Sequence, residues 1–163
     1  MEMEPGRILN RNLFLYLLDL EIKRARRYQN FLSILSLELI SSANGGGGDD
    51  LQTSHEMLAN FLTDEMRETD ISGSIGEKVI VVLLPYADHS DGNHAKARFE
   101  RSLKFYDFRS RGYDVAIHQT SFPADGTNTA EIMRRALGPE AQAPIQSPGG
   151  NHPAVDPCPG ESR

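Results

Sequence analysis

Apolar residues recur along the chain at helical spacing in some stretches and at strand spacing in others. Between positions 12 and 29 they lie three or four residues apart and therefore share one face of a predicted helix: Phe14, Leu17, Leu18 and Ile22. The next stretch, Phe31 to Ile40, is apolar at most positions, as in a central strand that is covered on both faces. Residues 1–10 precede this pair as a polar lead-in.

A second helix and a hairpin are predicted in the middle of the chain. Gly45 to Gly48 predict a flexible loop, after which Thr53 and Glu56 have the spacing of a capping box with Thr53 at the start of the helix. Two extended runs, residues 71–75 and 79–84, flank a short turn and predict a β-hairpin that ends at Pro85. The apolar face of the helix consists of Leu58, Phe61, Leu62 and Met66.

The remaining pattern predicts a helix, a strand and a short final helix. Residues 91–105 have helical spacing and residues 113–120 alternate as a strand does. Asn128 and Glu131 fit a second capping box, and Pro139 stops the helix that follows. The order helix, strand, helix, hairpin, helix, strand, helix predicts an α+β sandwich, in which helices cover both faces of a central, mainly antiparallel sheet.

Composition separates a domain from a tail. The chain has 163 residues, of which 39% are hydrophobic and 25% charged, as in a globular protein with one sizeable core. Residues 139–163 hold six of the nine prolines and few residues that could form a core. We therefore expect one folded domain followed by a disordered, Pro-rich tail at residues 139–163. The one cysteine, Cys158, cannot form an internal disulfide.

Charge and hydropathy narrow the expected partners. The net charge of −6 argues against a general nucleic-acid binder. The basic run from Lys23 to Arg27 lies at a predicted helix C-terminus, where cations complement the helix dipole; a nucleic-acid patch is the alternative. No apolar run reaches the ~18 residues of a membrane span, and the N-terminus does not resemble a signal peptide, so we expect a cytoplasmic protein without membrane contact. The histidines have no metal-binding spacing with the cysteine.

The hairpin and its surroundings resemble a known family. Gly76-Glu77-Lys78-Val79-Ile80 on the turn is followed directly by Val81-Val82-Leu83-Leu84-Pro85. Further matches are Asn10-Arg11, residues 21–28 with 32–35, residues 122–126 and residues 134–136. In this order, over about residues 8–138, the set resembles the GGDEF domains of diguanylate cyclases, with the turn at the position of the GGDEF motif.

The resemblance implies a chemistry that this chain has lost. Active members condense two GTP molecules, one on each subunit of a dimer, into cyclic di-GMP with divalent metal held by carboxylates. Glu38 stands at the first metal-ligand position of the family and is a plausible substitute for aspartate. The two acidic residues of the motif, however, are replaced by Lys78 and Val79. A protonated lysine cannot bind Mg²⁺, so we expect no metal, no other cofactor and no cyclase activity.

The resemblance also implies that the nucleotide contacts of the family are replaced. Glu77 stands at the second glycine position, where its carboxylate would crowd and repel phosphate. The guanine-contacting positions align near Gly46 and Gln52, which are neither asparagine nor aspartate. One alternative remains, in which Lys78 replaces the charge of the metal and preserves a metal-free GTP site.

A second site of the family has its residues in place. Many members bind cyclic di-GMP, their product, at an Arg-x-x-Asp before the motif, and Arg67-Glu68-Thr69-Asp70 stands at that spacing here. Arg98, on the following helix, aligns with a further arginine of the site. A guanidinium can form two parallel hydrogen bonds to guanine or phosphate, and a carboxylate can accept hydrogen bonds from guanine. Arg111 and Asp114 repeat the spacing outside this frame, and a surface charge pair is the alternative for Arg67 and Asp70.

The sequence therefore leaves two main functional hypotheses. The first is a catalytically inactive GGDEF-like domain that acts as a cyclic di-GMP receptor, in which a stacked ligand pair bridges two copies in a homodimer. The second is a dimerisation or docking scaffold for a protein partner, without nucleotide binding. Replacing Arg67 separates them, because a scaffold should be indifferent to it.

Overall fold

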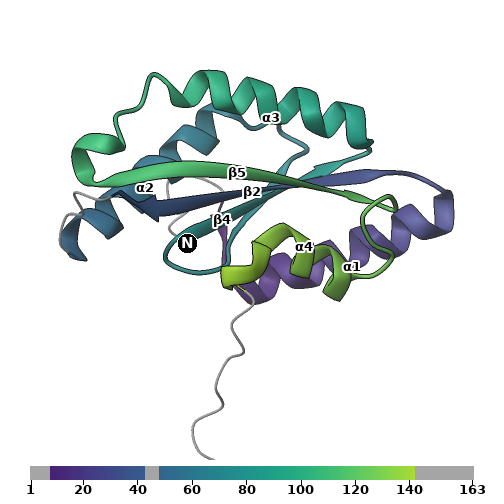
Figure 1. Ribbon diagram of the computed structural model, residues 1–163. Helices are drawn as coiled ribbons and strands as arrows, with labels where there is room; N and C mark the ends of the chain where they lie inside the picture. The colour runs from purple at the N-terminus through teal and green to yellow at the C-terminus, as the bar shows by residue number, and fades with distance from the viewer. Residues whose placement is uncertain (1–7, 43–47, 142–163) are drawn as a thin grey trace, which may run out of the picture.

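The computed structural model describes residues 8–42 and 48–141, and its order of helices and strands confirms the predicted one (Figure 1). The β1 strand and the short 3-10 helix η1 are additions to that prediction. The elements in chain order are β1 (Ile8–Leu9), α1 (Arg11–Tyr28), β2 (Leu32–Ser41), α2 (Gly48–Glu65), β3 (Ile71–Ser74), β4 (Val79–Pro85), α3 (His89–Leu103), η1 (Arg109–Arg111), β5 (Tyr113–Phe122) and α4 (Thr129–Ala141).

The described strands form one sheet in the order β1-β3-β4-β2-β5. Neighbouring strands are antiparallel, except that β1 runs parallel to β3. The central strand β2 pairs with β4 from Leu32 to Glu38 and with β5 from Leu32 to Ser41. The predicted α+β fold with a mainly antiparallel sheet is therefore confirmed.

Helices cover both faces of the sheet, with α2 and α3 on one face and α1 and α4 on the other (Figure 1). Alternate residues of β2 serve the two layers, because successive strand side chains point to opposite faces. Leu35, Leu37 and Leu39 belong to the core under α2 and α3, whereas Leu32 and Ile34 belong to the core over α1 and α4. This two-sided burial explains why the strand is apolar at most positions.

Two N-terminal boundaries differ from the prediction. The α2 helix begins at Gly48, so Thr53 lies inside it and the predicted cap at Thr53 is wrong. Leu51 packs against the core between α2 and the sheet, which favours continuing the helix back into the last glycine of the loop. Ile8 and Leu9, assigned to a polar lead-in, form β1 instead.

The α3 helix begins at His89, earlier than the predicted Asp91, because Asp88 caps it. The backbone N–H of Asp91 donates to Oδ1 of Asp88 at 2.8 Å, and the N–H of Asp88 donates to Oδ2 of Asp91 at 3.2 Å. This is a capping box with aspartate at the position where glutamate or glutamine is usual. The cap fixes the point at which the chain leaves β4 and enters α3.

The second predicted capping box is half correct. Oδ1 of Asn128 accepts from the N–H of Glu131 at 2.9 Å, but the Glu131 carboxylate accepts from the N–H of Thr127 at 3.1 Å. The helical geometry of α4 breaks at Gly138, with φ 66° and ψ 176°, and the element continues to Ala141, past the predicted stop at Pro139. The rest of the predicted tail lies outside the described residues.

The basic run at the end of α1 is engaged by neighbouring groups. Lys23 pairs with Asp19 at 2.8 Å and Arg24 with Glu21 at 3.1 Å. Arg26 donates to a backbone carbonyl in the loop before α4. These contacts are all with the chain itself and lie within or beside the last turns of the helix.

A buried polar cluster ties the start of α3 to the sheet. Oγ of Ser33 lies 3.0 Å from the carbonyl oxygens of both Ala87 and Asp88 and 2.9 Å from Oγ of Ser121. A Cβ atom at Gly92 would overlap the side-chain amide of Gln119 and the Ser33 hydroxyl, so α3 approaches the sheet closely at this glycine. The segment between β4 and α3 is thereby held against β2.

Gly73 on β3 is packed so closely that a methyl group should destabilise the fold. A Cβ atom at this position would overlap Cβ and Cγ of the buried Phe14 on α1. We expect Gly73→Ala to lower the free energy of unfolding by about 1–3 kcal/mol, because α1 must move away from the sheet. Urea denaturation measures this, and Gly76→Ala, where a Cβ meets nothing, is the control. Equal stability of the two variants would contradict this packing.

Candidate functional site

Arg67 and Asp70 lie in the tight turn between α2 and β3. The Asp70 side chain is buried, and its Oδ2 accepts from the backbone N–H of Arg67 at 2.9 Å. The N–H of Asp70 donates to the carbonyl of Arg67 at 3.1 Å, which closes the turn. The carboxylate thus binds the backbone of Arg67, and no ion pair joins the two side chains. Within the described residues, the exposed guanidinium of Arg67 has no hydrogen-bond or ion-pair partner.

Arg98 reaches the same region from α3. Its Nη2 donates to the carbonyl oxygen of Glu65 at 3.2 Å, and its Nε lies 3.8 Å from the Glu65 carboxylate. The guanidinium also lies 5.3 Å from the centre of the Phe99 ring. Its Nε is buried without a hydrogen-bond partner in the described part of the chain. Arg98 is therefore positioned from two sides but retains donor capacity.

A pocket of about 570 Å³, called here the arginine pocket, brings these residues together. Its cationic side chains come from the α2–β3 turn and from α3, while its two carboxylates, Asp70 and Asp91, are engaged by backbone N–H groups. The pocket therefore offers guanidinium groups to a ligand while its acids serve the fold. Its lining residues are Arg67, Thr69, Asp70, Leu84, Pro85, Tyr86, Ala87, Asp91, His94, Ala95, Arg98 and Arg101.

Residues 76–80, which the sequence aligns with the GGDEF motif, lie on the β3–β4 turn and the start of β4, at the other end of these strands. Gly76, Glu77 and Lys78 are exposed, and the Lys78 carbonyl accepts from the N–H of Leu39 at 2.8 Å. Val79 pairs directly with Glu38 across β2 and β4. The structure thus places the predicted ligand position Glu38 beside the motif. Among the described residues, no three His, Cys, Asp or Glu side chains gather closely enough to hold a metal ion.

A second pocket, of about 520 Å³, lies between this turn and α2. Nε2 of His55 lies 3.3 Å from Oγ of Ser74, which in turn donates to the carbonyl of Gly76 at 3.1 Å. Burial lowers the pKa of His55 from its ordinary value, although the charges of Glu56 and Glu77 oppose this, so the ring is neutral at pH 7. The described residues that line this pocket therefore offer no cation to a phosphate. Its lining residues are Leu51, Gln52, His55, Ser74, Gly76 and Glu77.

His55 is the residue at this pocket that the sequence did not single out. The histidine spacing predicts no metal site and no other role, but His55 lies on α2 and is half-buried. Its spacing of three residues from Gln52 places both on one helical face, which is the signal that could have found it. Of the two positions that the resemblance aligns with guanine contacts, Gln52 lines the pocket and Gly46 lies outside the described residues.

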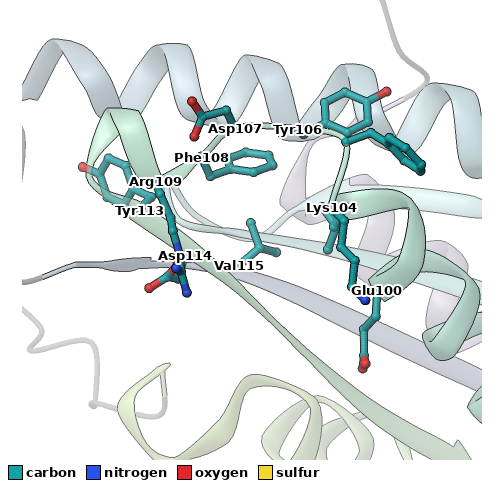
Figure 2. A pocket seen from close by; sticks show the side chains of 11 residues that line it. Glu100, Lys104, Tyr106, Asp107, Phe108, Arg109, Tyr113, Asp114 and Val115 are labelled. Carbon is teal, nitrogen blue, oxygen red and sulfur yellow. The ribbon is translucent and has the colours of Figure 1, made fainter.

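A third pocket, of about 560 Å³, lies at the C-terminal end of α3 and is shown in Figure 2. Its walls include the aromatic rings of Tyr106, Phe108 and Tyr113. Asp114, from the second Arg-x-x-Asp, lines this pocket and pairs with Arg109 at 3.1 Å (Figure 2). This second repeat of the spacing therefore contributes nothing to the arginine pocket.

Solved structures share this fold, although sequence comparison alone finds no relative. No family model and no curated protein sequence matches the chain. A diguanylate cyclase protein from Thermotoga maritima superposes with a TM-score of 0.67 at 14% identity, over 80% of this chain and 94% of the other. The active GGEEF domain of a diguanylate cyclase from Vibrio cholerae gives 0.62 at 17% identity, over 79% and 86%.

A third structure was solved with a ligand. The GGDEF domain of DgcB from Caulobacter crescentus, in complex with c-di-GMP, superposes with a TM-score of 0.57 at 12% identity, over 82% of this chain and 81% of the other. Separately, none of the helices in the described part of the chain is both long and apolar enough to cross a membrane. At the 12–17% identity of these three structures, the similarity concerns the fold. This chain has the α+β fold of the GGDEF domains of diguanylate cyclases.

Proposed function

We propose that this protein is a catalytically inactive GGDEF-like domain that binds cyclic di-GMP in the arginine pocket. The observation that carries the proposal is the convergence of Arg67, Arg98 and Arg101 on one cavity. These residues come from the α2–β3 turn and from α3, which are distant in sequence, and none of the described acids forms an ion pair with Arg67. Guanidinium groups with free donors are suited to phosphate and to the acceptor edge of guanine.

The residues at the motif support inactivity. Phosphoryl transfer from GTP requires neutralisation of the triphosphate, which carboxylate-bound metal ions supply in this family. Here Lys78 and Val79 stand at the two positions that are acidic in the family motif. Glu77 adds a negative charge on the same turn. Glu38 alone is one carboxylate, which is too few ligands for a Mg²⁺ ion that must also hold phosphate.

A cyclic di-GMP receptor of this kind also explains how a domain without chemistry could signal. Two stacked ligand molecules can bridge the arginine-bearing surfaces of two copies, so we propose a ligand-linked homodimer. The change in assembly would then be read by a protein partner. Because the ligand is an intracellular messenger, we place this activity in the cytoplasm.

Isothermal titration calorimetry of cyclic di-GMP into the purified protein tests the receptor. We expect saturable binding in the micromolar range, and sedimentation velocity of the same samples should show a dimer only when ligand is present. Absence of heat and of any change in assembly would refute the receptor and favour a docking scaffold.

Incubation with GTP and Mg²⁺ or Mn²⁺ tests the missing activity. We expect no cyclic di-GMP by chromatography under conditions in which an active diguanylate cyclase converts GTP completely. Product formation by the wild-type chain would overturn the assignment of the motif as degenerate. Binding of GTP without metal, lost in Lys78→Ala, would instead support the metal-free site.

A further inference from the structure

Tyr86 has a backbone conformation that its residue type disfavours. Its φ is 59°, in the left-handed region, and among the described non-glycine residues only Gln29 shares such a value. Gln29 is the C-cap of α1, where left-handed backbone is common. Tyr86 follows a strand, and glycine, asparagine or aspartate would adopt its conformation at lower cost.

The backbone on both sides of Tyr86 is fixed by the fold. Pro85 closes the register of β4 against Leu32 of β2, and the carbonyls of Ala87 and Asp88 lie 3.0 Å from the Ser33 hydroxyl. The chain must reverse between these anchors within a few residues. The surrounding structure therefore holds the backbone of Tyr86 in its left-handed conformation.

The ring remains at the surface, beside the guanidinium groups. Tyr86 is 75% exposed, which is high for a large aromatic side chain, and it lines the arginine pocket together with Arg67 and Arg98. An exposed aromatic face next to cations suits a ligand that is both planar and anionic. A nucleotide has these properties, because its base stacks on an aromatic ring while its phosphate binds arginine.

We propose that Tyr86 is the stacking platform for a guanine base of the ligand in the arginine pocket. This inference rests on the proposed function and adds a recognition element to it. One base lies against the phenol ring, and the phosphates and the second base are left to Arg67, Arg98 and Arg101. The strained, exposed tyrosine then contributes its ring to ligand binding and does not stabilise the turn.

The absence of tryptophan from the chain allows a direct optical test. In Tyr86→Trp the single indole sits on the proposed platform, and stacking of guanine should quench its fluorescence as cyclic di-GMP is added. Tyr16→Trp is the matched control, because Tyr16 is 62% exposed and lies on α1, away from the pocket. We expect saturable quenching in the first variant and none in the second.

Affinity and stability of other variants complete the test. We expect Tyr86→Ala to bind cyclic di-GMP about tenfold more weakly than wild type, and Tyr86→Phe to bind within twofold, since the ring and not the hydroxyl is used. Tyr86→Gly should lose affinity in the same way while unfolding at equal or higher urea concentration, because glycine relieves the backbone strain. Opposite changes of affinity and stability are not expected for a purely structural residue.

The failures are distinguishable. If wild type and Tyr86→Ala bind cyclic di-GMP equally well and Tyr86→Trp is not quenched, the platform is wrong and the receptor stands. If the wild type does not bind at all in calorimetry, the proposed function fails and the platform fails with it.

Discussion

Replacing Arg67 with alanine is expected to raise the dissociation constant for cyclic di-GMP about a hundredfold. The exposed guanidinium can form two parallel, charge-assisted hydrogen bonds to the ligand, worth about 3 kcal/mol together. Its side chain has no partner within the described residues, so its removal breaks nothing in the free protein. Calorimetric titration of the wild type and the variant under identical salt conditions measures the difference.

The matched control is Arg109→Ala, which removes an arginine outside the arginine pocket. Arg109 is highly exposed and, among the described residues, pairs only with Asp114. Exposed ion pairs contribute little, so this variant should keep both its stability, within about 0.5 kcal/mol, and its affinity. Equal affinities of wild type, Arg67→Ala and Arg109→Ala would show that the ligand binds elsewhere. A general effect of lost positive charge would instead weaken binding to both variants alike.

The sequence predicts correctly those parts of the fold in which a local run of residues is explained by a single physical effect. The β-branched run from Val79 to Val82 forms β4, and the apolar β2 is buried on both faces. The boundaries were less predictable, because tertiary contacts moved them. Leu51 reaches the core and extends α2 to Gly48, while Asp91 completes a cap that the usual glutamate pattern does not include.

The candidate site shows the same division. The spacing of Arg67 and Asp70, set in the family frame, identified the turn that lines the pocket, and Arg98 was found by its place on the next helix. The sequence gives no sign that Asp70 binds a backbone N–H, since this depends on how the turn closes. Nor does it show the left-handed backbone of Tyr86, which is imposed by the anchors on either side.

Packing between α2 and α3 connects the fold to the site. Arg67 lies two residues beyond the end of α2 and Arg98 lies on α3, so the distance between their guanidinium groups depends on how these helices meet. Phe61 of α2 contacts Phe99 of α3 edge to face, with ring centres 5.9 Å apart. Arg98 neighbours Phe99 in sequence and lies against its ring. The geometry of the arginine pocket therefore rests on an aromatic contact in the core.

Phe61→Ala is accordingly expected to lower the free energy of unfolding by about 3–5 kcal/mol, as for other large-to-small changes in a core. Phe61 is fully buried and also contacts Tyr106 edge to face at 5.2 Å, so its loss removes two aromatic contacts and leaves a cavity. Urea denaturation measures the change.

Phe105→Ala is the matched control for this prediction, since Phe105 has the same side chain but is 90% exposed. Its stability should stay within about 0.5 kcal/mol of the wild type. Phe61→Ala should also bind cyclic di-GMP more weakly at temperatures where it remains folded, because Arg67 and Arg98 lose their fixed separation. A destabilised Phe61→Ala with unchanged affinity would mean that the α2–β3 turn positions Arg67 without help from the helix contact.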